Sequence, residues 1–336
     1  MKNIRKFETT AAMDAATLED VSINYNVETN GVLTLPLGGG NSIKNYMRFV
    51  AVEDSQINLT SRNMTTGEAD TSVDLKHSKD GVTWTQYDFN PIPLAAGETL
   101  YLKGNNENGF CYMNEETGEA RMCTFGDIMH DGGTSGKFEC HGNIMSLLYG
   151  DNFEDKTTIP SVGCFVYTLA LTPITTAPEL PATTLAKWCY QHVFEGCTSL
   201  TTAPELHATT LAERCYNYMF SGCTSLTTAP ELPATTLYNA CYESMFNGCT
   251  SLTKAPELPA TTLADGCYFQ MFNGCNNLNH ITMLATDVSA TECLKFWLQD
   301  VSLTGTFVKH PDMDSLPTGV DGIPEGWTVI DYNFKN

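Results

Sequence analysis

The sequence predicts a mainly β protein with short helical turns, in which an N-terminal antiparallel β-sandwich is followed by a solenoid. Two observations lead to this prediction. Short β-rich runs separated by Gly, Asp or Asn recur between about residues 41 and 146. A 26-residue unit then occurs four times in succession from Thr175 to Leu278, and a fixed period of this kind is the signature of stacked coils.

The first 40 residues are predicted to be a separate arm and linker. VSINYNV (Val21–Val27) and GVLTLPL (Gly31–Leu37) are expected as strands that are joined by a turn. Three consecutive glycines, Gly38–Gly40, mark the clearest flexible break in the chain. We therefore expect residues 1–40 to be an arm that is separate from the rest of the chain; its role as an anchor is implied by the resemblance given below.

Residues 41–146 are predicted to form the antiparallel sandwich. SKDGVTW (Ser78–Trp84) holds the Asp-Gly pair that is expected of a tight hairpin. The Gly-rich segment Asn105–Lys137 is expected to be a long loop or an edge region. The expected strands are NYMRFVAV, SQINLTS, SVDLKHS, TWTQYDF and ETLYLKG.

Residues 147–304 are predicted to form the solenoid and residues 305–336 its C-terminal cap. An eroded coil is expected before Thr175, and Asn279–Thr304 is a diverged fifth copy. In each copy, a short strand around APEL and a helical turn around the segment CYNYMFSG are expected to aim the fixed apolar positions inward. In the second copy these positions are Leu206, Leu211, Cys215, Phe220, Cys223 and Leu226.

The composition narrows the partners that this chain can have. Its net charge is -21, from 18 Lys and Arg against 39 Asp and Glu, which argues against nucleic acid and anionic membranes. No run approaches the ~18 apolar residues of a membrane span. The N-terminus begins with basic residues but lacks the apolar core of a signal peptide, so the chain either stays in the cytoplasm or has lost a leader.

Nine of the 13 cysteines fall in two registers of the repeat. The simplest interpretation is that each fills a small buried slot, because an unoxidised cysteine behaves as a compact hydrophobe. Disulfides between neighbouring coils are the alternative, since coils about 4.8 Å apart allow the required Cα separation. A zinc ladder is disfavoured, because the spacing within a repeat is not that of a zinc-binding pair.

Two sets of residues are candidates for binding. Positions 13, 14, 17, 18 and 21 of the unit vary between copies and are expected to face solvent; aromatic and basic side chains gather there, as in contact hot spots. The residues concerned are Trp188, His192, Arg214, Tyr218 and Phe269. The second set is a column of carboxylates, interpreted as a solvated ladder or, alternatively, a calcium site: Glu179, Glu205, Glu231 and Glu257.

The sequence offers little for catalysis. The seven histidines are scattered without a partner pattern, and no nucleophile elbow, phosphate loop or metalloprotease motif occurs. We therefore predict that the protein is not an enzyme and uses no metal or cofactor.

At the level of motifs, the repeat resembles the BspA-like, or Treponema-type, leucine-rich repeats. MFSGCTSL (Met219–Leu226) is similar to the second half of that family's unit, and LTTAPELPATTL (Leu226–Leu237) to its first half, although the period is longer than usual. The likeness covers about Gly142 to Ile330. It implies a leucine-rich-repeat solenoid of the kind found in surface adhesins that bind host proteins and, among relatives, in phage virions.

The arm MKNIRKFETTAAMDAA is similar to the start of structural proteins of gut phages. The resemblances together imply a non-enzymatic virion protein that contacts other virion proteins through its arm and a host-surface or mucosal protein or glycan through its repeats. The alternative is a secreted or surface-anchored bacterial adhesin, and an intracellular scaffold is least favoured. Homo-oligomer formation is left open.

Overall fold

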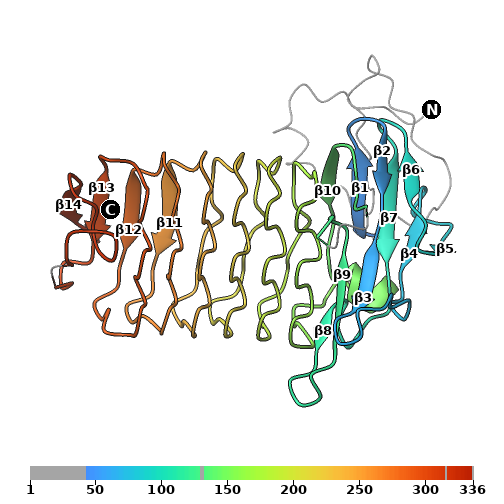
Figure 1. Cartoon of the computed structure of the whole chain (residues 1–336), viewed down its shortest axis with the longest axis horizontal. Helices are drawn as coiled ribbons and strands as arrows, with labels where there is room; N and C mark the ends of the chain where they lie inside the picture. The colour runs from blue at the N-terminus through green and yellow to red at the C-terminus, as the bar shows by residue number, and fades with distance from the viewer. Residues whose placement is uncertain (1–42, 129–131, 315, 335–336) are drawn as a thin grey trace, which may run out of the picture. The chain divides into compact units, whose positions relative to one another are not determined.

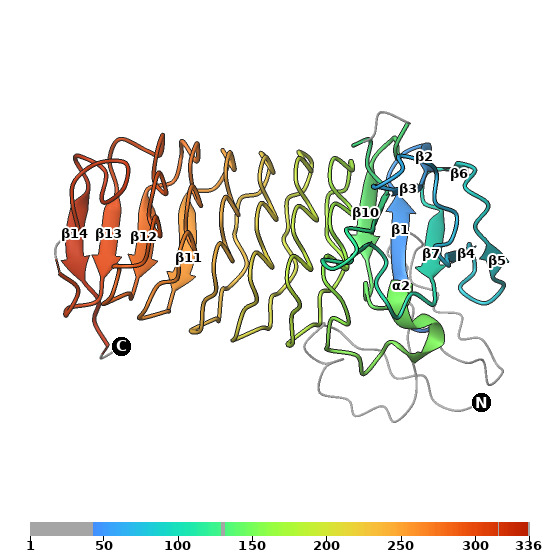
Figure 2. The same cartoon turned by 60° about the horizontal axis from the view of Figure 1, so that its bottom comes forward.

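The structure is a computed structural model that describes residues 43–128, 132–314 and 316–334. Within these residues the chain is mainly β, with four sheets and one short α-helix (Figures 1 and 2). From Lys44 onward it forms one compact unit. The predicted arm, with its two expected strands, lies outside the described residues.

Three antiparallel sheets make up the N-terminal part of this unit. The largest has the strand order β10-β1-β7-β4-β5, and its strands are β1 (Met47–Ala51), β4 (Lys76–Ser78), β5 (Thr85–Gln86), β7 (Thr99–Lys103) and β10 (Phe138–His141). The smaller sheets pair β2 (Ser55–Ile57) with β6 (Ile92–Leu94), and β9 (Ala120–Thr124) with both β3 (Thr60–Asn63) and β8 (Tyr112–Met113). Buried and partly exposed residues alternate along β1 and β7. This alternation matches the period-two pattern of apolar residues in their sequences, because successive side chains of a strand point to opposite faces.

The hairpin predicted at Ser78–Trp84 is present, because β4 and β5 pair across it, but it is not tight: the nearest paired residues are His77 and Thr85, so all of Ser78–Trp84 forms the connection. The Thr83 N–H, the Ser78 hydroxyl and the Val82 N–H all bond to the Asp80 carboxylate and hold the pKa of that group well below its usual range. Gly81 follows with a φ of 71°, a conformation that favours glycine.

The segment Asn105–Lys137, predicted to be a long loop or an edge region, contains two strands, β8 and β9, and β8 is an edge strand of its sheet. They form a hairpin in which the Asn114 N–H donates to the carbonyl of Glu119 and Gly118 has a φ of 71°. The sequence does not predict these strands, because β8 has only two residues and β9 (ARMCT) has just one β-branched side chain.

The sheet region runs into the repeats without a break in hydrogen bonding. A single helical turn, α2 (Ser146–Tyr149), and the 3₁₀ turn η1 (Gly150–Asn152) follow β10. The segment around β10 then pairs parallel with the residue before the first strict copy, at Phe138↔Ile174, and with that copy itself, at Asn143↔Glu179. The predicted boundary at residues 146/147 therefore falls inside one compact unit.

The APEL side of the repeats is joined by parallel pairing. Isolated bridges connect the first copies, at Thr176↔Thr202, Thr202↔Thr228 and Leu180↔Leu206. Full strands appear only later, in the parallel sheet β11 (Lys254–Leu258), β12 (His280–Met283), β13 (Thr306–Lys309) and β14 (Thr328–Asp331). Each APEL segment carries a proline, which has no N–H to donate; in β11 this is Pro256, and the pairing with β12 is irregular there, between Lys254 and Glu257. The cap predicted at residues 305–336 supplies β13 and β14 and extends the sheet.

The predicted helical turn around CYNYMFSG is wrong. From Arg214 to Gly222, every second N–H donates to a carbonyl of the next repeat, at 2.7 to 3.1 Å, and the N–H groups between them close β-turns within the repeat. An α-helix would direct all of these donors to its own carbonyls. The segment is a run of consecutive β-turns that binds one repeat to the next.

These turns place three residues of each repeat in the left-handed conformation. In the second copy they are Arg214 (φ 52°), Tyr218 (φ 54°) and Gly222 (φ 73°). Each is the third residue of a turn, a place that favours glycine in type II turns. Only the last of the three is glycine in every strict copy. The other two hold L-residues at a cost that the stacked neighbours must offset.

Exchanging glycine and alanine at these positions should change stability in opposite directions. Ala240 (φ 52°) stands where the next copy has Gly266, so Ala240→Gly is expected to raise the free energy of unfolding by up to about 1 kcal/mol. Gly248 (φ 71°) has room for a methyl group, so Gly248→Ala should lower it by about 1–2 kcal/mol through backbone strain alone. Urea unfolding of both variants checks this; equal signs would contradict it.

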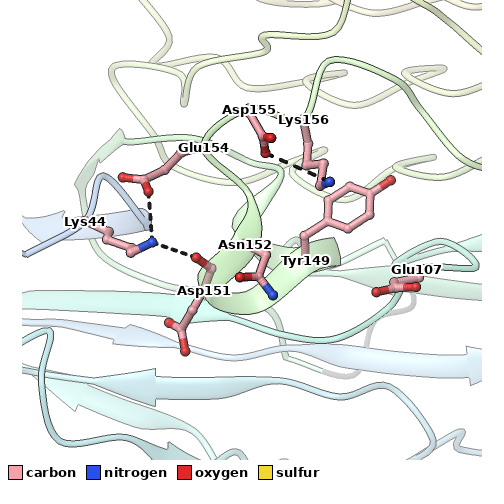
Figure 3. Close-up of a pocket in the computed structure, with 8 residues that line it drawn as sticks. All are labelled: Lys44, Glu107, Tyr149, Asp151, Asn152, Glu154, Asp155 and Lys156. Atoms are coloured by element: carbon pink, nitrogen blue, oxygen red, sulfur yellow. Dashed lines mark hydrogen bonds and ion pairs between the residues drawn. The ribbon is translucent and has the colours of Figure 1, made fainter.

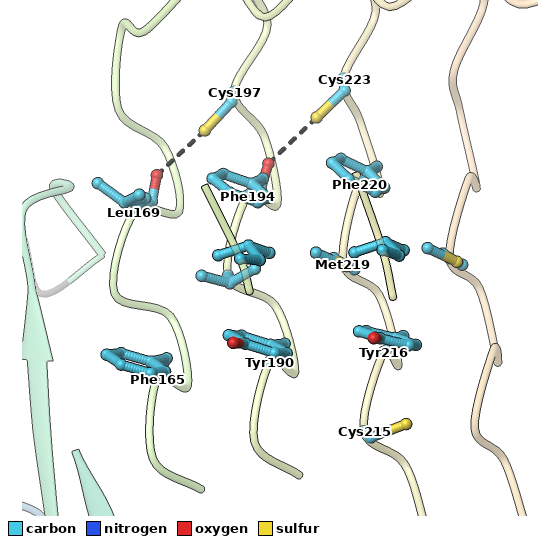
Figure 4. Packing of buried hydrophobic residues seen from close by; sticks show 14 of the residues in the cluster. Phe165, Leu169, Tyr190, Phe194, Cys197, Cys215, Tyr216, Met219, Phe220 and Cys223 are labelled. Carbon is cyan, nitrogen blue, oxygen red and sulfur yellow. Dashed lines mark hydrogen bonds between the residues drawn. The ribbon is translucent and has the colours of Figure 1, made fainter. Parts of the chain in front are cut away.

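Side chains of successive repeats stack in columns inside the array (Figure 4). One column runs Phe165, Tyr190, Tyr216, Tyr242 and Tyr268, with ring centroids 5.7 to 6.1 Å apart. A second runs Phe194, Phe220, Phe246 and Phe272, with centroids 5.5 to 5.7 Å apart. These rings are buried and belong to one core that is continuous from Tyr46 to Trp327. The fixed apolar positions of the second copy are buried as predicted, and the tyrosine column is an addition to them.

All 13 cysteines are buried and free, which confirms the compact-hydrophobe interpretation. In the second register each thiol has a hydrogen-bond acceptor in the preceding repeat. The Sγ atoms of Cys223 and Cys249 donate to the carbonyls of Phe194 and Phe220, both at 3.1 Å. No helix among the described residues is long and apolar enough to cross a membrane.

Candidate binding surface

The turn side of the first repeats carries a three-ring stack. His192 lies between Tyr167 and Tyr218, with ring centroids 4.2 and 4.9 Å away and planes within 21° of parallel. His192 and Tyr218 occupy the same left-handed position in successive repeats, so the stacking of repeats also stacks these rings. All three side chains are partly exposed. Burial, and secondarily the charge of Glu195, raises the pKa of Tyr167 to about 12.

Trp188 and Arg214 share the other left-handed position of these two repeats. The main-chain N–H of Trp188 donates to the main-chain carbonyl of Glu213, the residue before Arg214, at 3.1 Å. Lys187 lies 4.5 Å from the centroid of the Trp188 ring and pairs with Glu213 at 3.3 Å. Trp188 is partly buried under these contacts, whereas Arg214 is exposed.

Two carboxylates complete the surface. Glu195 is 2.8 Å from Nδ1 of His192, with its side chain one-third exposed. Burial raises the pKa of Glu243, and the charges of Arg214 and His192 and a bond from Asn217 oppose this. We refer to Tyr167, Trp188, His192, Glu195, Arg214, Tyr218 and Glu243 as the turn-side patch. It combines flat ring faces, a guanidinium and two carboxylates, the groups that make reversible contacts in binding interfaces.

The structure places four of the five predicted aromatic and basic residues in this patch, but not Phe269. Phe269 lies two repeats beyond Tyr218, and its ring packs edge-on against Phe296, with centroids 6.3 Å apart. Lys295 is 5.9 Å from its centroid. The third copy contributes only Glu243 to the patch, because its left-handed positions hold Ala240 and Ser244, and Phe269 therefore lies apart from the ring stack.

The expectation that all variable positions face solvent is wrong. Asn217, Ala240 and Ser244 are buried, with exposed fractions of 2%, 7% and 0%. Asn217 is held inside because its Oδ1 accepts a bond from Nε2 of Gln191, at 2.9 Å. Variation between copies at these sites therefore reflects local packing as well as exposure.

The carboxylate column lies on the APEL side and is separate from the patch. Glu179 pairs with Asn143 in a bridge and accepts a bond from Nδ2 of Asn45, at 2.8 Å. Glu257 belongs to β11 and interacts with Tyr332, whereas Glu205 and Glu231 are exposed. Among the described residues, no three His, Cys, Asp or Glu side chains are grouped so as to hold a metal ion.

Sequence reasoning missed Tyr167, Glu195 and Glu243. The coil before Thr175 is one residue shorter than the others at its turn, so Tyr167 lies 25 residues before His192 and a fixed period of 26 passes over it. Aligning Phe165 with Tyr190 would have revealed it. Glu195 and Glu243 stand at variable positions of the unit, but only aromatic and basic side chains were selected there, and only the fold shows that the two carboxylates lie beside His192 and Arg214.

A separate hollow of about 710 Å³ opens beside η1, and Lys44, Tyr149, Asp151 and Glu154 line it (Figure 3). Nζ of Lys44 binds the Glu154 carboxylate and the Asp151 carbonyl, at 2.8 and 2.7 Å. Burial favours a raised pKa for Asp151, but bonds from Lys103 and Tyr46 outweigh it and lower the pKa. The charged side chains of this rim pair with one another at the surface, and such exposed ion pairs contribute little to stability.

Comparison of this chain with protein-family models, with curated proteins and with solved structures finds no match.

Proposed function

We propose that this chain is a non-enzymatic structural and adhesion protein of a phage virion. In this proposal residues 41–146 form a sandwich-like spacer and residues 147–304 a leucine-rich-repeat solenoid. The parallel bridges and the side-chain columns between consecutive copies support a solenoid. The repeat motifs support the leucine-rich-repeat assignment, and the residues of the arm support the virion.

The observation that carries the proposal is the turn-side patch. An exposed arginine, a partly exposed three-ring stack and a tryptophan gather on the first two strict copies and the coil before them, whereas the third copy has Ala240 and Ser244 at the corresponding positions. Aromatic residues and arginine are the side chains that most often dominate binding energy. The proposed ligand is a host-surface or mucosal protein or glycan.

Substituting the patch with the residues of the third copy tests this function. Tyr218→Ser and Arg214→Ala keep side chains that the array already carries at these backbone positions. We expect the double variant to bind immobilised mucin or whole host cells at least about tenfold more weakly, the loss typical of hot-spot residues. Surface plasmon resonance or cell sedimentation measures it.

A matched control for this experiment lies on the APEL side. Glu231→Gln changes an exposed carboxylate outside the patch and should leave adhesion unchanged. Equal binding by the patch variant and the original chain would overturn the turn-side patch as the adhesion surface.

The anchor is tested separately. Deleting Met1–Pro36 should abolish incorporation into particles while leaving adhesion intact; unchanged incorporation would rule out the arm as the anchor. The alternative function, a secreted or surface-anchored bacterial adhesin, is favoured by the resemblance of the repeats. Neighbouring capsid or tail genes would support the virion protein, and an upstream leader or lipidation cysteine the adhesin.

A further inference from the structure

An open cavity of about 870 Å³ lies at the C-terminal end of the repeats, between the fifth copy and the cap. Its apolar wall includes Leu298, Val301, Leu303 and Val320, and its acidic side chains are Asp300 and Glu325. No Lys, Arg or His is among the residues that line it. The site is therefore apolar with a negative rim.

Two lining residues are departures from the repeat. Asp300 has a φ of 57°, and the four strict copies have glycine at this position. Leu303 stands where those copies have Ser199, Ser225, Ser251 and Asn277. The fifth copy thus replaces a strain-free glycine with a strained carboxylate, and a polar side chain with an apolar one, at the same cavity.

Leu303 and Val320 are exposed apolar side chains at the end of the array, where a polar surface is expected. Terminal repeats keep an array soluble by presenting a polar outer face. Here Leu303 is 87% exposed and Val320 is 45% exposed. Exposed apolar side chains gathered beside charged ones are typical of an interaction site.

We propose that this cavity binds the basic N-terminal segment of a second copy of the chain, residues 2–7. This segment (KNIRKF) has the complementary composition: Ile4 is flanked by Lys2 and by Arg5 and Lys6, and no acidic residue precedes Glu8. The segment holds three of the 18 Lys and Arg residues of a chain whose net charge is -21. The apolar side chain fits beside Leu303 and Val320, and the cations pair with Asp300 and Glu325.

The charge balance of the chain makes this pairing selective. Two whole copies repel one another, so association requires a local site where the signs are opposite. The basic segment and the acidic cavity provide such a site. Because exposed charges are screened beyond about 8–10 Å at ordinary ionic strength, the association should weaken as salt is added. This inference does not depend on the proposed function.

Sedimentation velocity of the full chain at rising concentration tests the proposal. The original chain should associate, and Leu303→Ser should weaken the association roughly tenfold or more, because one leucine side chain is no longer buried. Asp300→Gly should weaken it as well while leaving thermal stability equal or higher, since it removes a left-handed L-residue. A chain that is monomeric at every concentration would overturn the proposal.

A mixing experiment identifies the occupant. One full-length variant, Leu303→Ser, keeps the basic segment but lacks the apolar contact; another, Arg5→Glu with Lys6→Glu, keeps the cavity but lacks the charge. Each should be largely monomeric alone, and the mixture should form heterodimers through the remaining intact pair of sites. If the mixture stays monomeric, or if either variant alone associates like the original chain, residues 2–7 of a second copy are not the ligand.

A charge reversal provides the specificity control. Asp300→Lys with Glu325→Lys should abolish association with the original segment. The same change combined with Arg5→Glu and Lys6→Glu should restore it within about tenfold, since the signs are again opposite. Failure of the combined variant to associate, while it remains folded, would contradict the assigned charge pairing.

Discussion

Raising the pH from about 8 to about 10 is expected to unfold this protein in one cooperative step. Eleven cysteines have exposed fractions of 0%, and burial raises the pKa of each thiol. They are Cys123, Cys140, Cys164, Cys189, Cys197, Cys215, Cys223, Cys241, Cys249, Cys267 and Cys275. For Cys164, Cys197 and Cys275 the raised pKa is about 12.

The direction of the effect follows from proton binding. In the unfolded chain a cysteine thiol has a pKa of about 8.5, so above that pH unfolding releases protons that the folded state retains. The free energy of unfolding is therefore unaffected below this pH and falls as the pH rises above it. At about pH 9.5 each thiol lowers it by about 1.4 kcal/mol. Eleven together lower it by roughly 15 kcal/mol, as much as the whole stability of a typical domain.

Circular dichroism during an alkaline titration, with a reductant present, measures this transition. Return of the signal at pH 7 separates it from oxidation. Replacing Cys223 and Cys249 by alanine removes two of the eleven thiols and should reduce the slope of unfolding free energy against pH by about two-elevenths. A stability that stays constant between about pH 7.5 and 9.5 would be inconsistent with thiols that remain protonated in the folded state.

Phe220→Ala should lower the free energy of unfolding by about 3–5 kcal/mol, the cost of emptying a large buried site. Phe220 is 0% exposed and stacks on both Phe194 and Phe246, with centroids 5.5 and 5.7 Å away. Each aromatic pair adds about 0.5–1.5 kcal/mol beyond burial. Urea unfolding at pH 7 measures the change.

Phe269→Ala is the matched comparison for this substitution. Its ring is only partly buried and makes an edge contact with Phe296, so the loss should be clearly smaller. If the two variants lose the same stability, the central position of Phe220 in its column does not determine the cost.

The interior of the repeats could be predicted from the sequence because it depends on spacing. Positions such as Phe220 and Cys223 return every 26 residues with the same chemistry, and stacking turns that regularity into columns. The helical turn was mispredicted for the opposite reason. One repeat viewed alone does not reveal that every second N–H group of its turn segment donates to the next repeat. Only Gly222 among the three left-handed positions marks its conformation by residue type.

The binding surface was only partly predictable for a related reason. Variability identified Trp188 and Tyr218, but it also identified Ser244, which is buried. Variation at a position shows that several side chains are tolerated there. Exposure to solvent permits this, but so does a buried site whose neighbouring side chains can repack. Tyr167 escaped because a single-residue deletion shifts it out of the period.

The hydrogen bonds between repeats have a consequence for how the gene can change. The main-chain donors of a turn reach no further than the adjacent copy, and the Cys223 thiol likewise reaches only the copy before it. An interior copy can therefore be duplicated or lost by recombination without changing the contacts that the first and last repeats make with the segments beside them. Each such event moves the C-terminal cavity by one repeat, about 4.8 Å, relative to the N-terminal sheets. The number of copies therefore sets the distance between the two ends of the array in fixed increments.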